Sequence, residues 1–432
     1  MLLNFSVGNY LSFKSIQSLN MVPDALKELK ENLHTPYLYD PNDKVLKSIA
    51  IYGHNSHGKS NFIRAFQFLR DFIFSSFSLG QTQSQIDVAP FRLNTEMLNK
   101  PSFFEITFLI KETKYRYQIQ LNAERVIAEG LYYAESGIRE NYLFERVEKD
   151  IKVSKSWNKD NGNKIENLVP FAKQHVLFLS VLLSQDNINR VQEIAKWFNA
   201  SMIIPDEYKL EFTKARTVYS DIEYRPLILK FIEKADLGFT TIFDKIENTQ
   251  RGSRPIEKGL LNMWYDSEMK NFDLYTKHIV FDEHHKQVNT IEFELEKNES
   301  AGSIKYFIIV CLLAYAIKNN QLIWIDELDA RFHSDLLEML VTSFHDPKMN
   351  AINAQMIFTT HNTILMDKKL RRDQMVAVTK NEWGESELEK MHTSKKPIKI
   401  GKSVEREYRK GNLSGVSKKM KKDLGPELFD DL

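Results

Sequence analysis

The chain has 432 residues, of which 42% are hydrophobic and 27% are charged, and its formal net charge is +1. This length favours two domains, or one domain with a large insertion, and the composition is typical of a soluble globular protein. A net charge so close to zero excludes any argument for nucleic-acid binding from a global basic field. The single cysteine, Cys311, cannot form an internal disulfide, and its apolar surroundings predict that it is buried.

Targeting and membrane signals are weak. The N-terminus has neither the basic stretch nor the long apolar core of a signal peptide. The longest apolar run, residues 306–317, is shorter than the ~20 residues that span a bilayer. We therefore expect a cytoplasmic protein without a membrane segment, and a buried helix at residues 306–317.

In the first part of the chain, short apolar or alternating runs predict strands. They lie at residues 2–11, 48–52, 103–110, 115–121, 126–133 and 141–147. Apolar residues at helical spacing predict a helix over residues 60–77. Residues 152–167 are polar and predict a loop.

The second part of the chain mixes helices and strands. Helical patterns occur at residues 177–183, 188–198, 224–235 and 240–246, and a loop is expected at residues 247–260. Strands are predicted at residues 275–281, 289–295, 322–325, 355–359 and 375–379. Helices are predicted after Ser300 and over residues 334–344, and a polar segment ends the chain.

Residues 53–60 read Gly-His-Asn-Ser-His-Gly-Lys-Ser and fit G-x-x-x-x-G-K-[ST], the pattern of a phosphate-binding P-loop. The loop lies between a predicted strand and a predicted helix, so backbone amides and the helix N-terminus would hold phosphates. Lys59 would reach the outer phosphates of ATP, and Ser60 would bind Mg²⁺. The alternative, a glycine-rich turn before an ordinary helix, is the weaker interpretation. The predicted nucleotide-binding residues are Gly53, Asn55, Ser56, His57, Gly58, Lys59, Ser60 and Asn61.

Two acids directly follow the apolar run 322–325, as at the carboxyl end of a buried strand. Asp326 would position Mg²⁺ through its water shell, and Glu327 would orient the attacking water as a catalytic residue. On its own, this pattern favours a strand that ends in solvated acids. The P-loop upstream shifts the interpretation to a catalytic one.

Glu299-Ser300-Ala301-Gly302-Ser303 precedes the apolar helix. A turn of small residues at a helix N-terminus can bind phosphate, or can be a plain N-cap formed by Ser300 or Ser303. Because it lies shortly before Asp326, the segment resembles the signature motif of ABC-type ATPases. That resemblance implies that Ser300 and Gly302 face the γ-phosphate bound by the opposite subunit.

His361 follows the predicted strand 355–359, and an isolated loop histidine would normally carry no meaning. In ABC-type ATPases, however, the matching strand leads to the switch histidine that contacts the γ-phosphate, and His361 resembles it. Asp329 similarly matches the D-loop aspartate. No glutamine has a convincing Q-loop context: Gln81, Gln83 and Gln85 lie in a polar loop, and residues 90–93 are an alternative occupant of that region.

The order of these motifs, split by a long middle region, resembles the ABC/SMC-like (RecF/OLD-related) branch of P-loop ATPases. Within it, the chain is most similar to the RloA/AbiL-type ATPases of bacterial abortive-infection and anti-phage defence systems. The passages that carry the likeness are residues 5–13, 53–61, 299–303, 359–365, 370–374 and 405–411. The resemblance implies an α/β fold, with an ABC-type head of mixed sheet and flanking helices, an antiparallel β-subdomain and a mostly helical insertion.

Four parts follow from this likeness. Residues 1–150 would form the N-terminal half of the ATPase head, and residues 151–270 a mainly helical insertion. Residues 271–394 would form the C-terminal half of the head, and residues 395–432 a basic tail.

The resemblance also implies partners. Copies of the chain would close on ATP and Mg²⁺ as a homodimer or higher homo-oligomer. A separate effector, such as a nuclease or toxin of TOPRIM or RloB-like type, would act with it, and nucleic acid or a phage protein would be the trigger. The chain lacks the Glu and D-x-D pattern of a TOPRIM nuclease after the ATPase core.

The C-terminal tail and the biological role leave alternatives open. Residues 395–422 hold eleven Lys or Arg against two Glu, which is compatible with a nucleic-acid or acidic-partner contact or with a solvated helix face. The main alternative function is a RecF/SMC-like DNA-repair ATPase that binds DNA when ATP is bound. A transporter-associated ABC subunit fits neither the long middle region nor the Glu299–Ser303 sequence.

Overall fold

A computed structural model describes residues 1–36, 44–80, 82, 85–135, 139–205, 209–244, 273–331, 333–393 and 403–410. The chain forms two compact units, which are described separately. The first comprises residues 1–198 and 355–432, and the second comprises residues 199–354. The predicted four-part division has other boundaries and stays a prediction.

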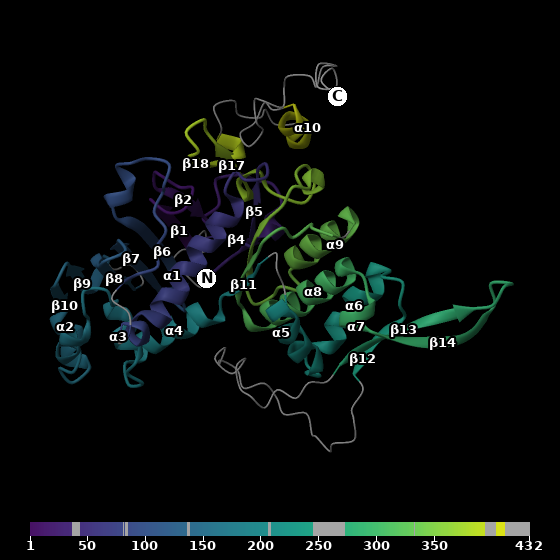
Figure 1. Cartoon of the computed structure of the whole chain (residues 1–432), viewed down its shortest axis with the longest axis horizontal. Coiled ribbons are helices and arrows are strands. Elements are labelled where there is room, and N and C mark those ends of the chain that lie inside the picture. The colour runs from purple at the N-terminus through teal and green to yellow at the C-terminus, as the bar shows by residue number, and fades with distance from the viewer. Residues whose placement is uncertain are drawn as a thin grey trace. The chain divides into compact units, whose positions relative to one another are not determined.

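The first unit contains a seven-stranded antiparallel sheet with the strand order β10-β9-β8-β7-β6-β1-β2 (Figure 1). Its strands are β1 (Leu2–Gly8), β2 (Gln17–Asn20), β6 (Ser102–Ile110), β7 (Thr113–Leu121), β8 (Val126–Ala134), β9 (Asn141–Val147) and β10 (Asp150–Val153). Residues on alternate positions of β7 are buried, because side chains alternate between the faces of a strand. Phe5 of β1 packs edge-on against Phe62 and Phe66, which fixes the sheet to the helix after the P-loop.

A separate set of strands in this unit carries the P-loop. The fully buried β5 (Ser48–Tyr52) pairs in parallel with β16 (Gln355–Thr359) and with β17 (Met375–Lys380). On the far side of β17, β18 (Ser386–Lys390) pairs in antiparallel fashion. Helix α1 (Lys59–Leu79) follows the loop. The first unit also contains the short strands β3 (Leu33–His34) and β4 (Val45–Leu46) and the helices α2 (Lys155–Asp160), α3 (Phe178–Leu183), α4 (Asn189–Ala200) and α10 (Val404–Arg409). Helix α4 lies at the boundary with the second unit.

A buried carboxylate joins the antiparallel sheet to α3. Glu129 of β8 accepts hydrogen bonds from the backbone amides of Phe178 (2.7 Å) and Leu179 (2.9 Å) and from the Tyr117 hydroxyl (2.9 Å). The Arg146 guanidinium lies 3.9 Å away, and both charged side chains are almost fully buried. Burial raises the pKa of Glu129, whereas Arg146 and the two amides oppose that rise. The carboxylate thus holds the start of α3 against the sheet.

Replacing Glu129 with glutamine should therefore destabilise the first unit. The variant keeps the side-chain shape but removes the charge that compensates the buried Arg146. We expect the melting temperature to fall by roughly 5–10 °C, the effect of losing about 3 kcal/mol. Differential scanning calorimetry measures this, with Glu112→Gln in the exposed β6–β7 turn as the control. A melting temperature equal to that of the control would show that the buried charge contributes nothing.

The second unit is organised around a long apolar helix. Helix α8 (Ala301–Asn319) is buried almost throughout, and α5 (Lys209–Ser220) and α6 (Arg225–Ala235) pack against it. Two parallel strands, β11 (Met202–Ile204) and β15 (Leu322–Ile325), and helix α9 (Ser334–His345) belong to the same unit. A three-stranded antiparallel sheet contains β12 (Thr241–Asp244), β13 (Leu274–Phe281) and β14 (Gln287–Glu294), and the short α7 (Leu295–Asn298) follows.

Helix α8 confirms the predicted buried helix, although it is longer than the apolar run. Among the described helices, it alone has the length and composition to cross a bilayer, but 83% of that stretch is buried in the structure. Cys311 lies within it, and burial raises the pKa of its thiol well above the usual value. The predicted interpretation of Cys311 as a small buried apolar residue is therefore confirmed.

The α/β class is confirmed, with a strand–P-loop–helix unit, an antiparallel sheet and mostly helical described residues between 155 and 235. Two local predictions are wrong. Residues 152–167, predicted as a loop, contain the end of β10 and α2, which is anchored by the buried Trp157. Residues 241–244, predicted as helix, form β12, because pairing with β13 overrides a weak helical pattern. Residues 247–260 lie outside the described residues.

Candidate functional site

The P-loop has the backbone conformation that its two glycines allow. Gly53 and Gly58 have φ angles of 151° and 107°, which residues with a Cβ rarely adopt. A Cβ at Gly53 would lie 2.6 Å from the carbonyl oxygen of Val378, and one at Gly58 would lie 2.6 Å from the Ser12 hydroxyl. Both glycines are therefore required by close packing as well as by the turn.

Lys59 and His361 meet at the first unit's P-loop. The buried Lys59 ammonium donates hydrogen bonds to the carbonyl oxygens of Gly53 (2.8 Å) and His54 (3.3 Å). It also lies 2.8 Å from Nε2 of His361. A neutral imidazole accepts a hydrogen bond from this ammonium, so the lysine and the histidine can face the same anionic group.

The strand register explains why these residues meet. β5 and β16 run in parallel, with Ile51 opposite Thr359, so their carboxyl ends lie at the same edge. Gly53 follows the first strand and His361 follows the second, and the Thr360 amide donates to the Ile51 carbonyl beyond the paired residues. Ligands bind at this edge of parallel sheets.

The β17–β18 hairpin supports the loop from outside. The Ser386 hydroxyl donates to the His57 carbonyl (2.6 Å), and the Lys380 ammonium donates to the Ser56 carbonyl (3.3 Å). His57 lies 3.3 Å from the Val378 carbonyl. Burial lowers the pKa of His57 and nearby basic side chains lower it further, whereas the hydrogen bond to the Val378 carbonyl opposes this shift.

The remaining predicted P-loop residues have different environments. Asn55 is exposed, whereas Ser60 is half-buried in the first turn of α1. The Asn61 amide donates to the Ser12 hydroxyl (2.9 Å), and the Ser386 amide donates to the Ser12 carbonyl (2.8 Å). Ser12 therefore links the β1–β2 turn, the P-loop and β18. Ser12, Ser386 and Lys380 are not among the residues predicted for the site from the sequence.

In the second unit, residues 299–303, the predicted signature segment, form the start of α8 and its N-cap. The Ser300 hydroxyl accepts a hydrogen bond from the Ser303 amide (3.0 Å), which confirms that Ser300 is an N-cap. A Cβ at Gly302 would collide with the Arg331 carbonyl oxygen, so a glycine is needed for this approach. The N-cap and the predicted phosphate contact are compatible, since a helix N-terminus serves both.

The predicted acids follow β15 in the same unit. Asp326 is buried, and its amide donates to the Ile204 carbonyl (2.9 Å). Glu327 has a φ of 49°, a left-handed conformation that is uncommon for glutamate, and its carbonyl accepts from the buried Lys305 ammonium (3.0 Å). Such conformations cluster at functional sites. Asp329 is half-buried two residues further on.

A family model matches residues 48–367, which span the P-loop, the signature segment, both acids and His361. Its description is "AAA domain, putative AbiEii toxin, Type IV TA system". The chain belongs to this family. As a member with an intact P-loop, it has an ATPase domain of AAA type, and the family supports ATP binding.

Two solved structures are similar over most of their length. One is the recombination mediator protein RecF with ATP, at 12% identity and a TM-score of 0.31, covering 90% of this chain and 97% of that chain. The other is RecF with ATPrS, at 10% identity and a TM-score of 0.28, covering 90% and 98%. Both TM-scores are too low to carry a functional conclusion for this AAA-domain chain. No curated protein matches its sequence.

The C-terminal helix α10 of this AAA-domain protein docks beside the P-loop strand. Tyr408 packs on Tyr52, with ring centroids 6.0 Å apart, and Tyr52 directly precedes Gly53. The Thr363 hydroxyl donates to Glu405 (2.8 Å), and Asp367 accepts from the Val404 amide (2.6 Å) at the helix N-terminus. The predicted tail thus begins as part of the first unit. Most of residues 395–422 lie outside the described residues.

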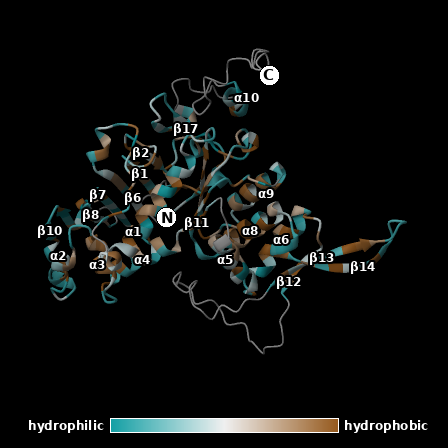
Figure 2. Ribbon diagram, viewed as in Figure 1, coloured by the Kyte–Doolittle hydropathy of each residue, from teal (hydrophilic) through white to brown (hydrophobic). Residues whose placement is uncertain are grey.

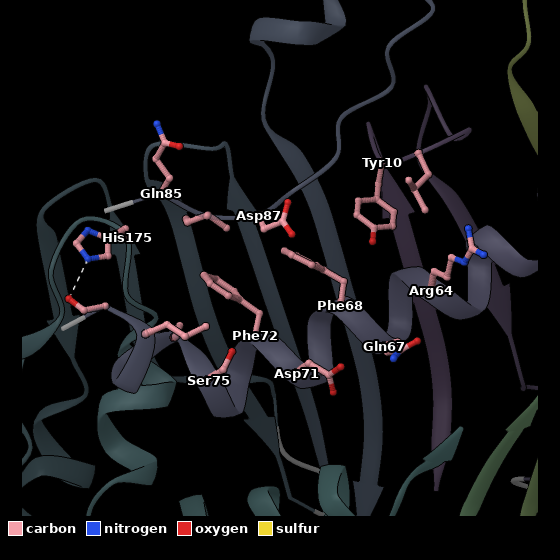
Figure 3. A pocket seen from close by; sticks show the side chains of 15 residues that line it. Tyr10, Arg64, Gln67, Phe68, Asp71, Phe72, Ser75, Gln85, Asp87 and His175 are labelled. Atoms are coloured by element: carbon pink, nitrogen blue, oxygen red, sulfur yellow. Dashed lines mark hydrogen bonds between the residues drawn. The ribbon is translucent and has the colours of Figure 1, made fainter. Parts of the chain in front are cut away.

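A cavity of about 540 Å³ lies along α1, between the helix and residues 85–87 (Figure 3). Its lining includes Tyr10, Phe68, Phe72 and His175, and the two phenylalanine rings stack. None of the predicted nucleotide-binding residues lines it. Gln85 does, but Gln81 and Gln83 lie outside the described residues, so a Q-loop glutamine is not identified.

No cluster of three His, Cys, Asp or Glu side chains that could hold a metal occurs among the described residues. The predicted Mg²⁺ site, which would use few protein ligands and several waters, stays a prediction. Ser60 has the position in the first turn of α1 that a P-loop serine needs. Asp326, the second predicted ligand, belongs to the other unit.

Proposed function

We propose that this chain binds and hydrolyses ATP as the sensor or regulator subunit of a bacterial anti-phage defence system. The observation that carries the ATPase part is the P-loop, in which the Lys59 ammonium lies against two loop carbonyls and His361. An ammonium there can transfer its hydrogen bonds to the outer phosphates of a bound triphosphate. The defence role rests on the family and on the RloA/AbiL-type resemblance.

In the proposed reaction, each residue has one task. The loop amides and Lys59 bind the phosphates. The Ser60 hydroxyl and, through the water shell of the ion, Asp326 would hold Mg²⁺, which would neutralise charge on the phosphates. Glu327 orients the attacking water, and His361 contacts the γ-phosphate. Ser300 and Gly302 of a second copy, with Asp329 at the interface, complete the site.

This arrangement makes ATP a clamp between copies of the chain. We propose a homodimer or higher homo-oligomer in the cytoplasm whose ATP-bound form holds a separate effector, such as a nuclease or toxin. A phage protein or nucleic acid would trigger release or activation. ATP binding alone would then raise the mass of the assembly, and hydrolysis would lower it again.

The test is to purify the chain with the product of the adjacent gene and to measure the assembly mass by light scattering. We expect one complex with ATP and Mg²⁺, and smaller species without nucleotide. If the adjacent product never associates with the chain but duplex DNA does in the presence of ATP, the defence proposal fails in favour of a DNA-repair ATPase.

A further inference from the structure

A buried carboxylate begins the signature segment. The Glu299 side chain is 8% exposed and directly precedes Ser300, the N-cap of α8. One of its oxygens accepts from the Thr276 hydroxyl (2.5 Å) and lies 2.7 Å from Nε2 of His278. Both partners belong to β13, so the signature is fastened to a strand that the proposed ATP chemistry does not otherwise use.

Strands β13 and β14 form a hairpin, and Thr276 and His278 lie on the same face of β13. Thr276 lies opposite Phe293 and His278 opposite Ile291, and residues two apart on a strand share a face. The His278 ring packs on Phe293 with centroids 4.6 Å apart, and Phe239 approaches its edge at 6.0 Å. The histidine is therefore fixed by packing as well as by the Glu299 oxygen, and its Nε2 position is defined.

The strand that holds Glu299 continues far from α8. β13 and β14 extend beyond α6 and α7 as a two-stranded arm, with hydrophobic residues along it (Figures 1 and 2). Near its end, Phe281 and Val288 are 56% and 58% exposed. Strand β13 thus belongs both to the arm, through its pairing with β14, and to the surroundings of the signature segment, through the contacts of Thr276 and His278 with Glu299.

We propose that Thr276 and His278 are positioning residues for ATP hydrolysis, which fix Glu299 and through it the start of α8. This rests on the proposed function, in which Ser300 and Gly302 complete the site of a neighbouring copy. The register of the Ser300 cap sets where those groups point. Loss of the β13 contacts would let the segment before α8 move, and would lower turnover without changing how the P-loop binds ATP.

The test compares His278→Ala with His278→Gln in the full chain. Because the glutamine amide nitrogen can occupy the position of Nε2, it should restore the contact with Glu299. We expect kcat of His278→Ala to fall about tenfold, the effect of one lost hydrogen bond to a charged group, with unchanged affinity for a fluorescent ATP analogue. His278→Gln should recover most of the rate. His284→Ala, in the exposed turn of the same hairpin, is the matched control and should match the parent.

Hydrogen exchange gives a readout that does not depend on catalysis. The Ser303 and Ile304 amides, which bond to Ser300, should exchange faster in His278→Ala than in the parent or in His284→Ala. Two results would overturn the positioning role. One is that these amides of His278→Ala exchange at the parental rate, and the other is that His278→Gln turns over ATP as slowly as His278→Ala. If the parent chain itself hydrolyses no ATP, the proposed function fails, while the exchange result still decides whether His278 fixes the signature.

Discussion

Replacing Lys59 with methionine should lower ATP turnover by about a hundredfold or more and weaken ATP binding, because phosphate charge loses its main protein counter-charge. The Lys59 ammonium is buried, donates hydrogen bonds to the carbonyl oxygens of Gly53 and His54, and lies 2.8 Å from Nε2 of His361. These contacts hold the ammonium at the loop. Methionine keeps the aliphatic stem, so the packing under the loop should survive.

Two measurements separate loss of chemistry from loss of structure. Phosphate release gives turnover, and the melting temperature without nucleotide should stay close to that of the parent. Added ATP should raise the melting temperature of the parent and not of the variant, since only a bound ligand stabilises the native state. Lys155→Met, an exposed lysine at the start of α2, is the control. Parental turnover in Lys59→Met would remove the P-loop from the proposed function.

The strand–loop–helix frame of the candidate site could be predicted because its signals are local. Strand β5, the loop glycines and the start of α1 follow one another within a few residues, and each has a distinct pattern. The same holds for β15 with Asp326 and Glu327. Periodicity also predicted α8, since an all-round apolar helix must be buried.

The sequence did not reveal which residues outside the P-loop contact it. Ser386 and Lys380 lie more than three hundred residues from the P-loop in sequence, and β18 is too polar to read as a strand. The wrong prediction for β12 also comes from a distant contact, because pairing with β13 determines the conformation of this segment. The contacts of Glu299 were equally hidden, because a glutamate before a helix suggests only an ordinary capping segment.

Replacing Glu327 with glutamine should leave ATP bound but reduce hydrolysis by about two to three orders of magnitude, because the amide cannot accept a proton from the attacking water. The left-handed φ of 49° and the bond from Lys305 to its carbonyl fix the backbone of this residue. Glutamine has the same shape, so these constraints persist in the variant. Its side chain would still reach the water but would not activate it.

The two active-site variants should consequently differ in assembly state. Glu327→Gln should accumulate the ATP-bound oligomer. Light scattering should then show a higher mass that persists for longer than the parent protein needs to hydrolyse the same amount of ATP. Lys59→Met should not form this oligomer. Glu283→Gln in the exposed hairpin turn should behave like the parent. If Glu327→Gln hydrolyses ATP at the parental rate, then the strained position after β15 serves packing around Lys305, and the catalytic base must be sought among other acids of the second unit.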